Sequence, residues 1–462
     1  MLFSRLCERS LTAPKIVGVL AALLLALGLV SSSTQAARSS PVPDAYTVST
    51  VLIGSGGAIG ALYQPDAPAP EQSTAFLFIH DVENLIGSLP CTQLAQRGFT
   101  VLCIKSEFTE YSLVDWDSLA LDVASGINYL HGLSTVRHVV LVGYSAGGPD
   151  VAYYQNVAQN GIATCQAPQR LDPCSSALAG LPPADGVILL DSIPGALSGL
   201  STLDPTVVDE HNLRIRNKSL DMFSAQNGYN PNGSSDYSTA FLNRYTRAQG
   251  ARMNRLIREA HHLLSQIKQG KGQYTDDSPM LVGAVNARPW EADLALLSHT
   301  KGEYPLLSPA HPDGGPPQVI HSVRVTSADP VADTQWDQTD GGYTASTFLS
   351  TGALRAPDFR VTADSITGVD WGSSNTSTIL NVRGIRSPLL IMGMTGHYWV
   401  VPSEMYYRAA TSTPSKTLVF VDGASHGLTP CTACATTPGE FGDTVGEIFN
   451  YITQWANQHY GS

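Results

Sequence analysis

The sequence predicts an α/β protein: a mostly parallel sheet of eight strands, flanked by helices, with a large insertion between the sixth and seventh strands. Two observations carry this prediction. From Tyr46 onward, short apolar runs rich in β-branched residues alternate with helical stretches, the pattern of a parallel sheet covered on both faces. The alternation stops at 194–386 and then resumes.

Length and composition agree with a folded protein that buries a large core. The 462 residues are 43% hydrophobic and 14% charged, whereas a disordered chain is poorer in apolar residues. The formal net charge of −12 repels phosphate backbones, and the sequence contains no basic patch with interleaved aromatic residues. Nucleic acid is therefore not an expected partner.

The first 37 residues have the order of a secretory signal peptide. Three basic residues come first, an uncharged apolar run follows at 16–30, and small residues lead to Ala36 and Ala37. An apolar run of about fifteen residues is shorter than the roughly twenty that a membrane-spanning helix needs. We expect cleavage near Ala36 or Ala37, a secreted or periplasmic protein, and no stable membrane anchor after cleavage.

Six cysteines follow the signal peptide, and an even number in an exported chain predicts disulfide bonds. They are Cys91, Cys103, Cys165, Cys174, Cys431 and Cys434. The short loops Cys165–Cys174 and Cys431–Cys434 are the favoured pairs, although the sequence does not fix the connectivity. Zinc binding by the Cys431 and Cys434 pair would require a second ligand pair at metal-like spacing, and the sequence has none.

The eight predicted strands are short and apolar. They lie at 46–53, 58–63, 75–80, 100–104, 139–142, 186–190, 389–392 and 417–421. Helical stretches separate or follow them. These lie at 89–97, 116–130, 147–158, 404–411 and 439–457.

The insertion interrupts this series and is expected to form a cap over the carboxyl edge of the sheet. It contains a helical stretch at 241–268, loops rich in Gly, Pro and Asp, and a possible strand at 319–325. The predicted division of the chain is a signal peptide at 1–37, a first part of the core at 38–193, the cap at 194–386 and a second part of the core at 387–462.

The strongest chemical motif is Gly-Tyr-Ser-Ala-Gly at 143–147. It follows the apolar run 139–142 directly, and a helical stretch begins at once. Ser145 is therefore expected in a tight turn at the carboxyl end of a strand. Gly143 and Gly147 are needed there because side chains would clash where the strand and the helix cross. Such a turn presents the serine hydroxyl as a nucleophile.

A serine hydroxyl needs a base that removes its proton, and imidazole, with an ordinary pKa near 6.5, is suited to this task. Most of the 12 histidines are expected to be ordinary surface or core residues. His426 differs because it follows the last predicted strand after a short turn and precedes Gly427. We predict that His426 is the base and that the reaction rate rises as it loses its proton.

The strand series, the 143–147 turn, His426 beside Gly427 and the His80-Asp81-Val82 turn together resemble the α/β-hydrolase superfamily, in its esterase and lipase branch. The resemblance covers about 46–195 and 385–457 and leaves the insertion outside. It implies a serine hydrolase with a catalytic triad and without a metal or organic cofactor. A shared fold does not fix the function, so the assignment depends on the site residues.

The triad acid has three candidates. The superfamily places it after the sixth or seventh strand, where it holds the histidine in the tautomer that accepts the serine proton. Asp191 ends the sixth predicted strand and is preferred. After the seventh strand, 393–402 has no carboxylate, and the first one, Glu404, is expected in the first turn of a helix, where it also complements the helix dipole. Asp422 is the third candidate.

By the same resemblance, the backbone N–H groups of Ala146 and Val82 bind the oxyanion that forms when Ser145 attacks a carbonyl. One such donor is typically worth about 10²–10³ in rate. Asp81 stands where many relatives have glycine, and its carboxylate would repel the oxyanion unless the side chain turns away. Three further residues either border the pocket or pack beneath the cap: His397, Tyr398 and Trp399.

These residues predict an exported serine hydrolase that cleaves carboxylic esters through an acyl-enzyme on Ser145, with a small or lipid-like ester as substrate. An amidase, peptidase or lactonase is the alternative within enzymes, because the triad does not select the leaving group. A catalytically silent binding protein is the alternative outside them, since no acid follows the seventh strand. A haloalkane dehalogenase or epoxide hydrolase would need an aspartate in place of Ser145.

Overall fold

The computed structural model describes residues 46–54, 58–66, 73–285, 288–326 and 342–461. The predicted signal peptide and its cleavage site lie outside these residues. The described residues belong to one compact unit, Asp44–Ser462. Among them, no helix combines the length and the apolar character that crossing a bilayer requires.

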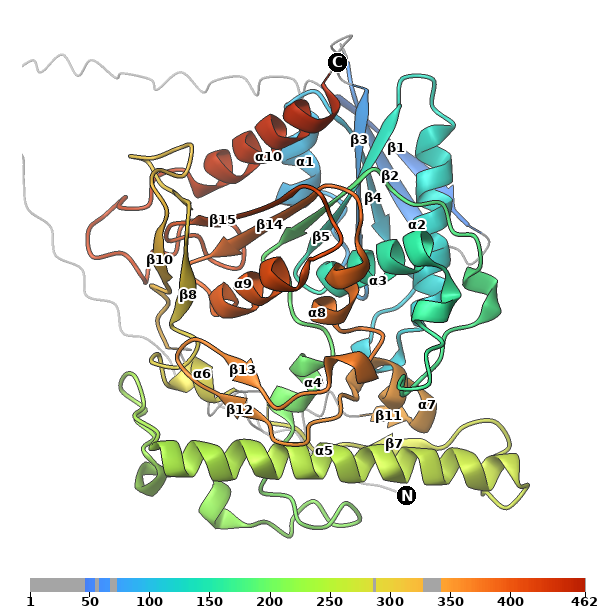
Figure 1. The fold of residues 1–462 in the computed structure, drawn as a ribbon, viewed down its shortest axis with the longest axis vertical. Coiled ribbons are helices and arrows are strands. Elements are labelled where there is room, and N and C mark those ends of the chain that lie inside the picture. The colour runs from blue at the N-terminus through green and yellow to red at the C-terminus, as the bar shows by residue number, and fades with distance from the viewer. Residues whose placement is uncertain (1–45, 55–57, 67–72, 286–287, 327–341, 462) are drawn as a thin grey trace, which may run out of the picture. The chain divides into compact units, whose positions relative to one another are not determined.

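A nine-stranded sheet lies at the centre of this unit (Figure 1). Its order is β1-β2-β4-β3-β5-β6-β14-β15-β9. The β1–β2 and β2–β4 pairs are antiparallel, and every other neighbouring pair is parallel. The strands are β1 (Tyr46–Ile53), β2 (Ala58–Pro65), β3 (Thr74–His80), β4 (Thr100–Lys105), β5 (His138–Tyr144), β6 (Gly186–Leu190), β9 (Leu306–Leu307), β14 (Leu389–Met394) and β15 (Lys416–Val421). The mostly parallel sheet predicted from the sequence is confirmed.

The sheet has nine strands rather than the eight predicted. All eight predicted strands are present, and their ends differ from the prediction by at most two residues. The additional strand, β9, comes from the insertion and pairs with Phe420 and Val421 of β15. A strand of two residues is too short to show an alternation of apolar and polar residues, so the sequence pattern did not reveal it. Leu307 of this strand is fully buried.

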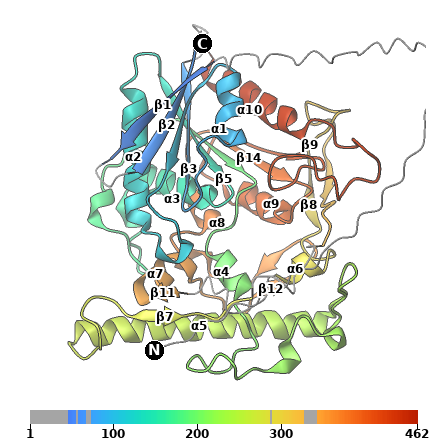
Figure 2. The same cartoon turned by 180° about the vertical axis from the view of Figure 1, so that it is seen from behind.

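Helices cover both faces of the sheet because successive strand side chains point to opposite faces. The face that carries Leu77 and Ile79 packs against α2 (Trp116–His131), α3 (Gly147–Asn160), α8 (Thr378–Asn381) and α9 (Val400–Ala409). The face that carries Phe76 and Phe78 packs against α1 (Leu89–Gln96) and α10 (Thr444–Tyr460). Figure 2 shows the same sheet from behind, with α1 and α10 side by side near the C-terminus.

The predicted helices of the core are all present, but two begin elsewhere. α9 begins at Val400 rather than 404, and Pro402 is accepted in its first turn because backbone N–H groups there have no partner within the helix. Glu404 is therefore the fifth residue of α9, beyond the first turn in which it was predicted. α10 begins at Thr444 rather than 439, because Asp443 caps it by accepting from Gly446 N.

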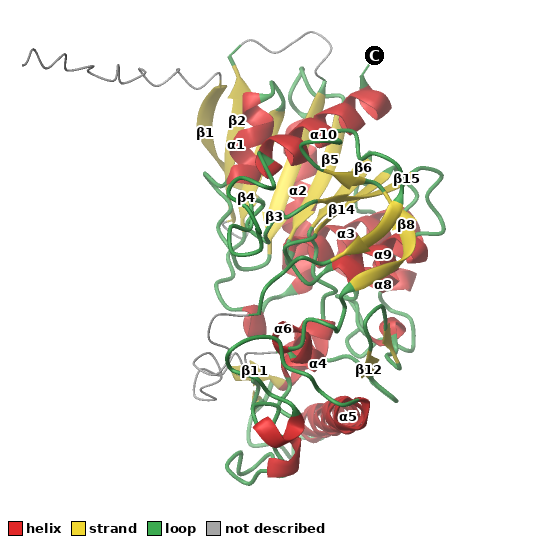
Figure 3. Ribbon diagram, turned by 90° about the vertical axis from the view of Figure 1, so that its left-hand side faces the viewer, coloured by secondary structure: helices red, strands yellow, loops and turns green. Residues whose placement is uncertain are grey.

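The insertion forms small helices and two-stranded sheets beside one long helix. Its elements include α4 (Leu197–Thr202), α5 (Thr239–Lys268), α6 (Pro289–Ala292), β7 (Pro279–Leu281), β8 (His299–Tyr304), β10 (Gln318–His321), β11 (Gly342–Thr344), β12 (Arg360–Val361) and β13 (Ile366–Thr367). Figures 1 and 3 show α4, α6, β11 and β12 between α5 and the sheet. The strand predicted at 319–325 is the shorter β10.

The apolar cluster of the insertion continues into the core. It contains Phe241, Trp290 and Phe348, and it extends to Trp399 and Val401 beside the end of β14. This continuity agrees with the single compact unit formed by core and insertion. The expected role of the insertion as a cap stays a prediction.

Three disulfide bonds join the six cysteines that follow the signal peptide. Cys91–Cys103 links α1 to β4, with Cα atoms 6.3 Å apart. Cys165–Cys174 closes a loop after α3, and Cys431–Cys434 closes a turn just after His426. The structure thus contains both pairs that the sequence favoured, and the sulfur atoms of Cys431 and Cys434 bond to each other.

We predict that peptide mapping of the unreduced protein recovers these three pairs. Alkylation before reduction should modify none of the six thiols, because every one is paired, and alkylation after reduction should modify all six. Mass spectrometry of the digested protein measures both results. Recovery of Cys91 linked to any cysteine other than Cys103 would contradict this pairing.

Candidate active site

Ser145 lies in a sharp turn between β5 and α3. Its φ of 55° is in the left-handed region, which residues other than glycine rarely adopt. The turn is fixed by β6 and the loop after it: Ser145 N donates to Leu190 O at 3.2 Å, and Ile193 N donates to Ser145 O at 3.0 Å. The backbone strain at the serine is therefore maintained by its neighbouring strand.

Gly143 and Gly147 allow the close crossing of strand and helix at this turn. A Cβ atom at Gly143 would overlap the carbonyl oxygen of Gly147 and the Cα atom of Gly148. A Cβ atom at Gly147 would overlap the carbonyl oxygen of Ile79 in β3. These overlaps are with backbone atoms, so a larger residue at either position would have to displace a strand or the helix.

His426 is placed beside the serine by the loop after β15. Its Nε2 atom lies 2.8 Å from Ser145 Oγ. The hydroxyl of Tyr144 donates to His426 O at 2.7 Å, and the two rings stack with centroids 5.4 Å apart. The His426 side chain is 35% exposed, whereas Ser145 is 9% exposed.

Asp191 completes a hydrogen-bonded chain with these two residues. Its Oδ2 atom lies 2.6 Å from His426 Nδ1, on the ring edge opposite the one that faces Ser145. Asp191 follows β6 with a φ of 44° and is fully buried. Its N–H donates to Met392 O of β14 at 2.8 Å, which anchors the strained residue on the next strand. The structure thus brings Ser145, His426 and Asp191 together.

The other two candidate acids lie in different surroundings. Glu404 accepts hydrogen bonds from Lys301 N at 2.9 Å and Gly302 N at 2.8 Å, and it pairs with Arg408 at 2.7 Å. These bonds connect α9 to β8. Asp422 accepts from Thr395 Oγ1 at 3.3 Å, and burial raises its pKa. Both carboxylates therefore have structural partners away from the imidazole of His426.

A second histidine, His397, contacts the same carboxylate oxygen as His426. Its Nδ1 atom lies 2.8 Å from Asp191 Oδ2, in a contact that is not aligned as a hydrogen bond. Its ring stacks on that of His426, with centroids 4.3 Å apart. The sequence left open whether His397 borders the pocket or packs beneath the cap. It carried no signal for this contact, because the partners come from loops after β6 and β14.

The two histidines keep Asp191 ionised in spite of its burial. Burial alone would raise the pKa of Asp191, but the attraction of His397 and then of His426 outweighs it and lowers the pKa to about 2. Burial also lowers the pKa of His397, against the attraction of Asp191. At neutral pH Asp191 is therefore a carboxylate that contacts both histidine rings.

The predicted oxyanion donors differ in their surroundings. Ala146 is the N-cap residue of α3, where backbone N–H groups lack partners within the helix. Val82 N donates to Asp81 Oδ1 at 2.9 Å and approaches His80 Nδ1 at 3.3 Å. The Asp81 side chain thus turns toward the Val82 donor rather than away from it. Val82 can bind an oxyanion only after this contact opens.

A buried carboxyl group in the first turn of α3 interacts with Asp81. Neither side-chain oxygen of Asp150 has a hydrogen-bond partner among the described residues. Burial, followed by the negative charge of Asp81, raises the pKa of Asp150 well above its ordinary value. The raised pKa favours the neutral form of Asp150, which reduces its repulsion from Asp81 close to the serine turn.

Asp191, His397 and His426 also present atoms that could bind a metal ion. One ligand atom from each lies within 4.8 Å of the others. Imidazole and carboxylate groups are ordinary zinc ligands. In this arrangement, however, His426 directs Nδ1 to Asp191 and Nε2 to Ser145, so a metal ion at Nδ1 would replace the Asp191 hydrogen bond.

The strand order, the serine turn after β5 and the histidine after β15 define an α/β-hydrolase fold. Solved structures similar to this chain include inhibited esterase B from Lactobacillus rhamnosis, with 11% identity and a TM-score of 0.40 over 91% of each chain. Carboxyl esterase 2 from Tuber melanosporum has 11% identity and a TM-score of 0.38, covering 92% of this chain and 90% of that one.

Proline iminopeptidase from Mycobacterium smegmatis is also similar, with 11% identity and a TM-score of 0.37 over 89% of this chain and 98% of that one. No described protein family and no curated protein matches this chain in sequence. At these identities and TM-scores, the similarity carries no information about the substrate. The chemistry of this chain must be argued from its own side chains.

We predict that Asp191→Asn slows the reaction of Ser145 with a fluorophosphonate by about 10⁴, the scale of loss when a triad aspartate becomes an amide. The amide cannot stabilise the imidazolium or hold the same tautomer. Glu404→Gln should change this rate only a few-fold, because Glu404 contacts β8 and Arg408 instead. The fraction of labelled protein, measured at a series of times, gives both rates. Circular dichroism confirms that the variants fold. If Glu404→Gln were labelled slowly and Asp191→Asn as fast as the unmodified protein, the assignment of Asp191 as the triad acid would be contradicted.

Proposed function

We propose that this chain is an ester hydrolase that acts through an acyl-enzyme on Ser145. The observation that carries the proposal is the hydrogen-bonded chain from Ser145 Oγ to His426 Nε2 at 2.8 Å and from His426 Nδ1 to Asp191 Oδ2 at 2.6 Å. A nucleophile, a base and an orienting acid in this order are the parts that acyl transfer requires.

In the first step, Ser145 Oγ attacks the carbonyl carbon of the ester while His426 Nε2 takes the hydroxyl proton. The resulting imidazolium is stabilised by the Asp191 carboxylate, which stays ionised because its pKa is about 2. Tyr144 holds the backbone of His426 through its hydroxyl, so the ring stays aligned during the transfer. The carbonyl oxygen of the substrate becomes an oxyanion.

The oxyanion is bound by the Ala146 N–H at the start of α3, where the positive end of the helix dipole also favours negative charge. Val82 N–H joins it when the substrate oxygen displaces the Asp81 carboxylate. The exchange replaces one anionic acceptor by another, so the donor is never left without a partner. Val82 therefore contributes less to substrate binding than a donor without an acceptor would.

Collapse of the tetrahedral intermediate breaks the ester C–O bond. His426 gives its proton to the leaving alkoxide, and the alcohol departs while the acyl group stays on Ser145 Oγ. Water then attacks the acyl carbon, with His426 as base, and releases the carboxylic acid and free Ser145. The cycle needs no group beyond the protein and water.

His397 acts in this scheme as a positioning residue. Its contact with Asp191 Oδ2 adds to that of His426, and its ring stacks on the His426 ring. Two loops are thereby fixed around one carboxylate. His397 follows β14, the strand after which some members of the superfamily carry the triad acid. In this chain the residue at that place attracts the acid, Asp191, instead of supplying it.

The insertion borders this site through Arg288. Its guanidinium donates to Tyr398 Oη at 3.3 Å and to Ser201 Oγ at 3.1 Å, and it pairs with Glu291 at 3.1 Å. Tyr398 is the neighbour of His397, and the two rings lie 4.0 Å apart. These contacts support the proposal that the insertion caps the site and selects the substrate.

Export is supported by the leader pattern of residues 1–37 and by the three disulfide bonds. Disulfides persist in oxidising compartments and are rare in the cytosol of most organisms. The proposed location is therefore extracellular or periplasmic, with a small or lipid-like ester as substrate.

We predict that the protein hydrolyses p-nitrophenyl esters and leaves the matching p-nitroanilides almost untouched. Ser145→Ala should lower kcat for the best ester by about 10⁶ without unfolding the protein, the scale seen when a triad serine is removed. Ser425→Ala serves as the matched control, because its hydroxyl lies next to His426 in sequence but contacts Thr429 instead. A chain-length series of esters gives the acyl preference.

Three results would contradict the proposal. Faster cleavage of anilides than of esters would indicate an amidase or peptidase. Most activity retained by a folded Ser145→Ala protein would exclude the acyl-enzyme. Absence of both cleavage and fluorophosphonate labelling would indicate a binding protein.

A further inference from the structure

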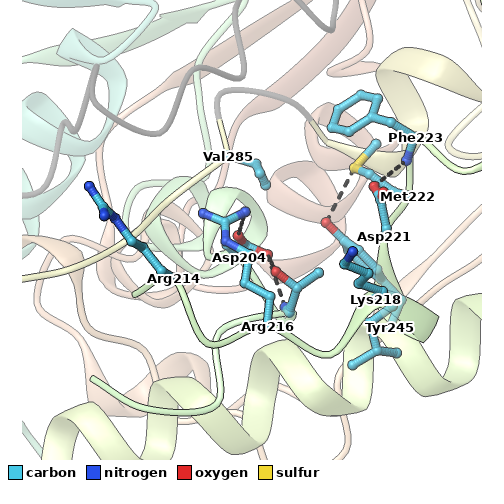
Figure 4. Close-up of a pocket in the computed structure, with 11 residues that line it drawn as sticks. Asp204, Arg214, Arg216, Lys218, Asp221, Met222, Phe223, Tyr245 and Val285 are labelled. Carbon is cyan, nitrogen blue, oxygen red and sulfur yellow. Dashed lines mark hydrogen bonds and ion pairs between the residues drawn. The ribbon is translucent and has the colours of Figure 1, made fainter. Parts of the chain in front are cut away.

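The insertion contains a cavity of about 390 Å³ (Figure 4). It is lined by the segment from Asp204 to Phe223, by Tyr245 of α5 and by Val285. Its volume lies within the roughly 300–1,000 Å³ typical of small-molecule sites. At roughly 30 Å³ for each non-hydrogen atom, the volume that a water molecule takes in the liquid, it has room for about a dozen such atoms.

Three cations gather on this cavity: Arg214, Arg216 and Lys218. Across the chain only 27 of 462 residues are Lys or Arg, so three within five positions is a marked local concentration. The segment folds back on itself, since Val208 N donates to Ile215 O and Asn217 N donates to Thr206 O. Arg214 lies in the turn between these contacts, and Lys218 begins a short 3-10 helix.

Two of the three cations have their charge available for a ligand. Arg216 pairs with the buried Asp204 at 2.9 Å, and Asp204 also accepts from Thr206 Oγ1 at 2.7 Å. Among the described residues, no carboxylate lies within ion-pair distance of Arg214 or Lys218. Figure 4 shows Arg214 and Lys218 on either side of the Asp204–Arg216 pair.

The lining also includes apolar and aromatic side chains. Met222 and Tyr245 are almost fully buried, and the Tyr245 hydroxyl is directed to Met222 Sδ at 3.2 Å. Val285 and Leu220 are also buried at the lining, while Phe223 is partly exposed. Asp221, the second carboxylate of the lining, accepts from Phe223 N at 2.9 Å. Three cations and two carboxylates leave one net positive charge beside an apolar wall.

We propose that this cavity binds a medium-chain fatty carboxylate, with the carboxylate at the cationic part of the lining that Arg214, Arg216 and Lys218 form and the alkyl chain against Met222, Tyr245 and Val285. The single net positive charge matches a monoanion better than a doubly charged phosphate. Arginine presents a fork of donors that suits a carboxylate, and the apolar wall favours an alkyl tail. The proposal does not depend on the role of Ser145.

The test is calorimetric titration of the purified protein with sodium octanoate. We expect one bound octanoate for each chain, and we expect Arg214→Ala/Lys218→Ala to weaken binding at least tenfold. Octan-1-ol, which has the same chain without the charge, and inorganic phosphate, which has charge without a chain, should both bind at least tenfold more weakly. The single variant Lys218→Ala serves if the double variant does not fold, and it should also weaken binding.

The matched control is Lys268→Ala/Lys271→Ala, which removes the same charge near the far end of α5. Lys268 is about 34 Å along the helix from Tyr245, at 1.5 Å for each residue. This variant should bind octanoate as the unmodified protein does. Equal affinity in both double variants, equal binding of octan-1-ol, or no detectable octanoate binding up to about 10 mM would overturn the proposal.

Discussion

The site depends on one buried negative charge. Asp191 is fully buried, and a carboxylate in such a place is unstable unless nearby groups compensate it. His426 and His397 both approach its Oδ2 atom, and their attraction overcomes the effect of burial on the pKa of Asp191. The need to compensate this charge accounts for the position of the His426 ring, which faces Ser145. It also accounts for the position of the loop after β14, which carries His397.

The parallel sheet provides the rigidity that this charge needs. Ser145 and Asp191 both have left-handed backbone angles, each of which costs of order 1–3 kcal/mol in an ordinary residue. Each is tied to the neighbouring strand, Ser145 to Leu190 and Asp191 to Met392. The sheet therefore maintains two strained residues side by side, and the strain directs their side chains toward one histidine.

The parts of this arrangement that could be predicted from the sequence are those with a local signal. The turn around Ser145 is defined by its own glycines and its neighbouring strand and helix, and His426 by its place after the last core strand. The choice among Asp191, Glu404 and Asp422 could not be made locally, because it depends on how loops from different strands meet. The contact of His397 with Asp191 has the same origin.

Other departures from the sequence-based expectation have physical causes of their own. β9 is too short to show a pattern, and it pairs with β15 because Leu307 becomes buried there. Val82 was predicted to donate to the oxyanion, but the Asp81 side chain accepts a hydrogen bond from its N–H. Charge pairing inside the site and strand pairing at the sheet edge are tertiary effects, so a motif or a propensity does not reveal them.

The most direct test of this account is the tautomer of His426, read by nuclear magnetic resonance of protein labelled with ¹⁵N histidine and assigned with a His426→Gln variant. With the ring neutral, the account predicts a proton on Nδ1, bonded to Asp191, and a bare Nε2 that faces Ser145; in Asp191→Asn the proton should leave Nδ1. A neutral His426 with its proton on Nε2 in the unmodified protein would contradict the account, because that nitrogen could not accept the serine proton.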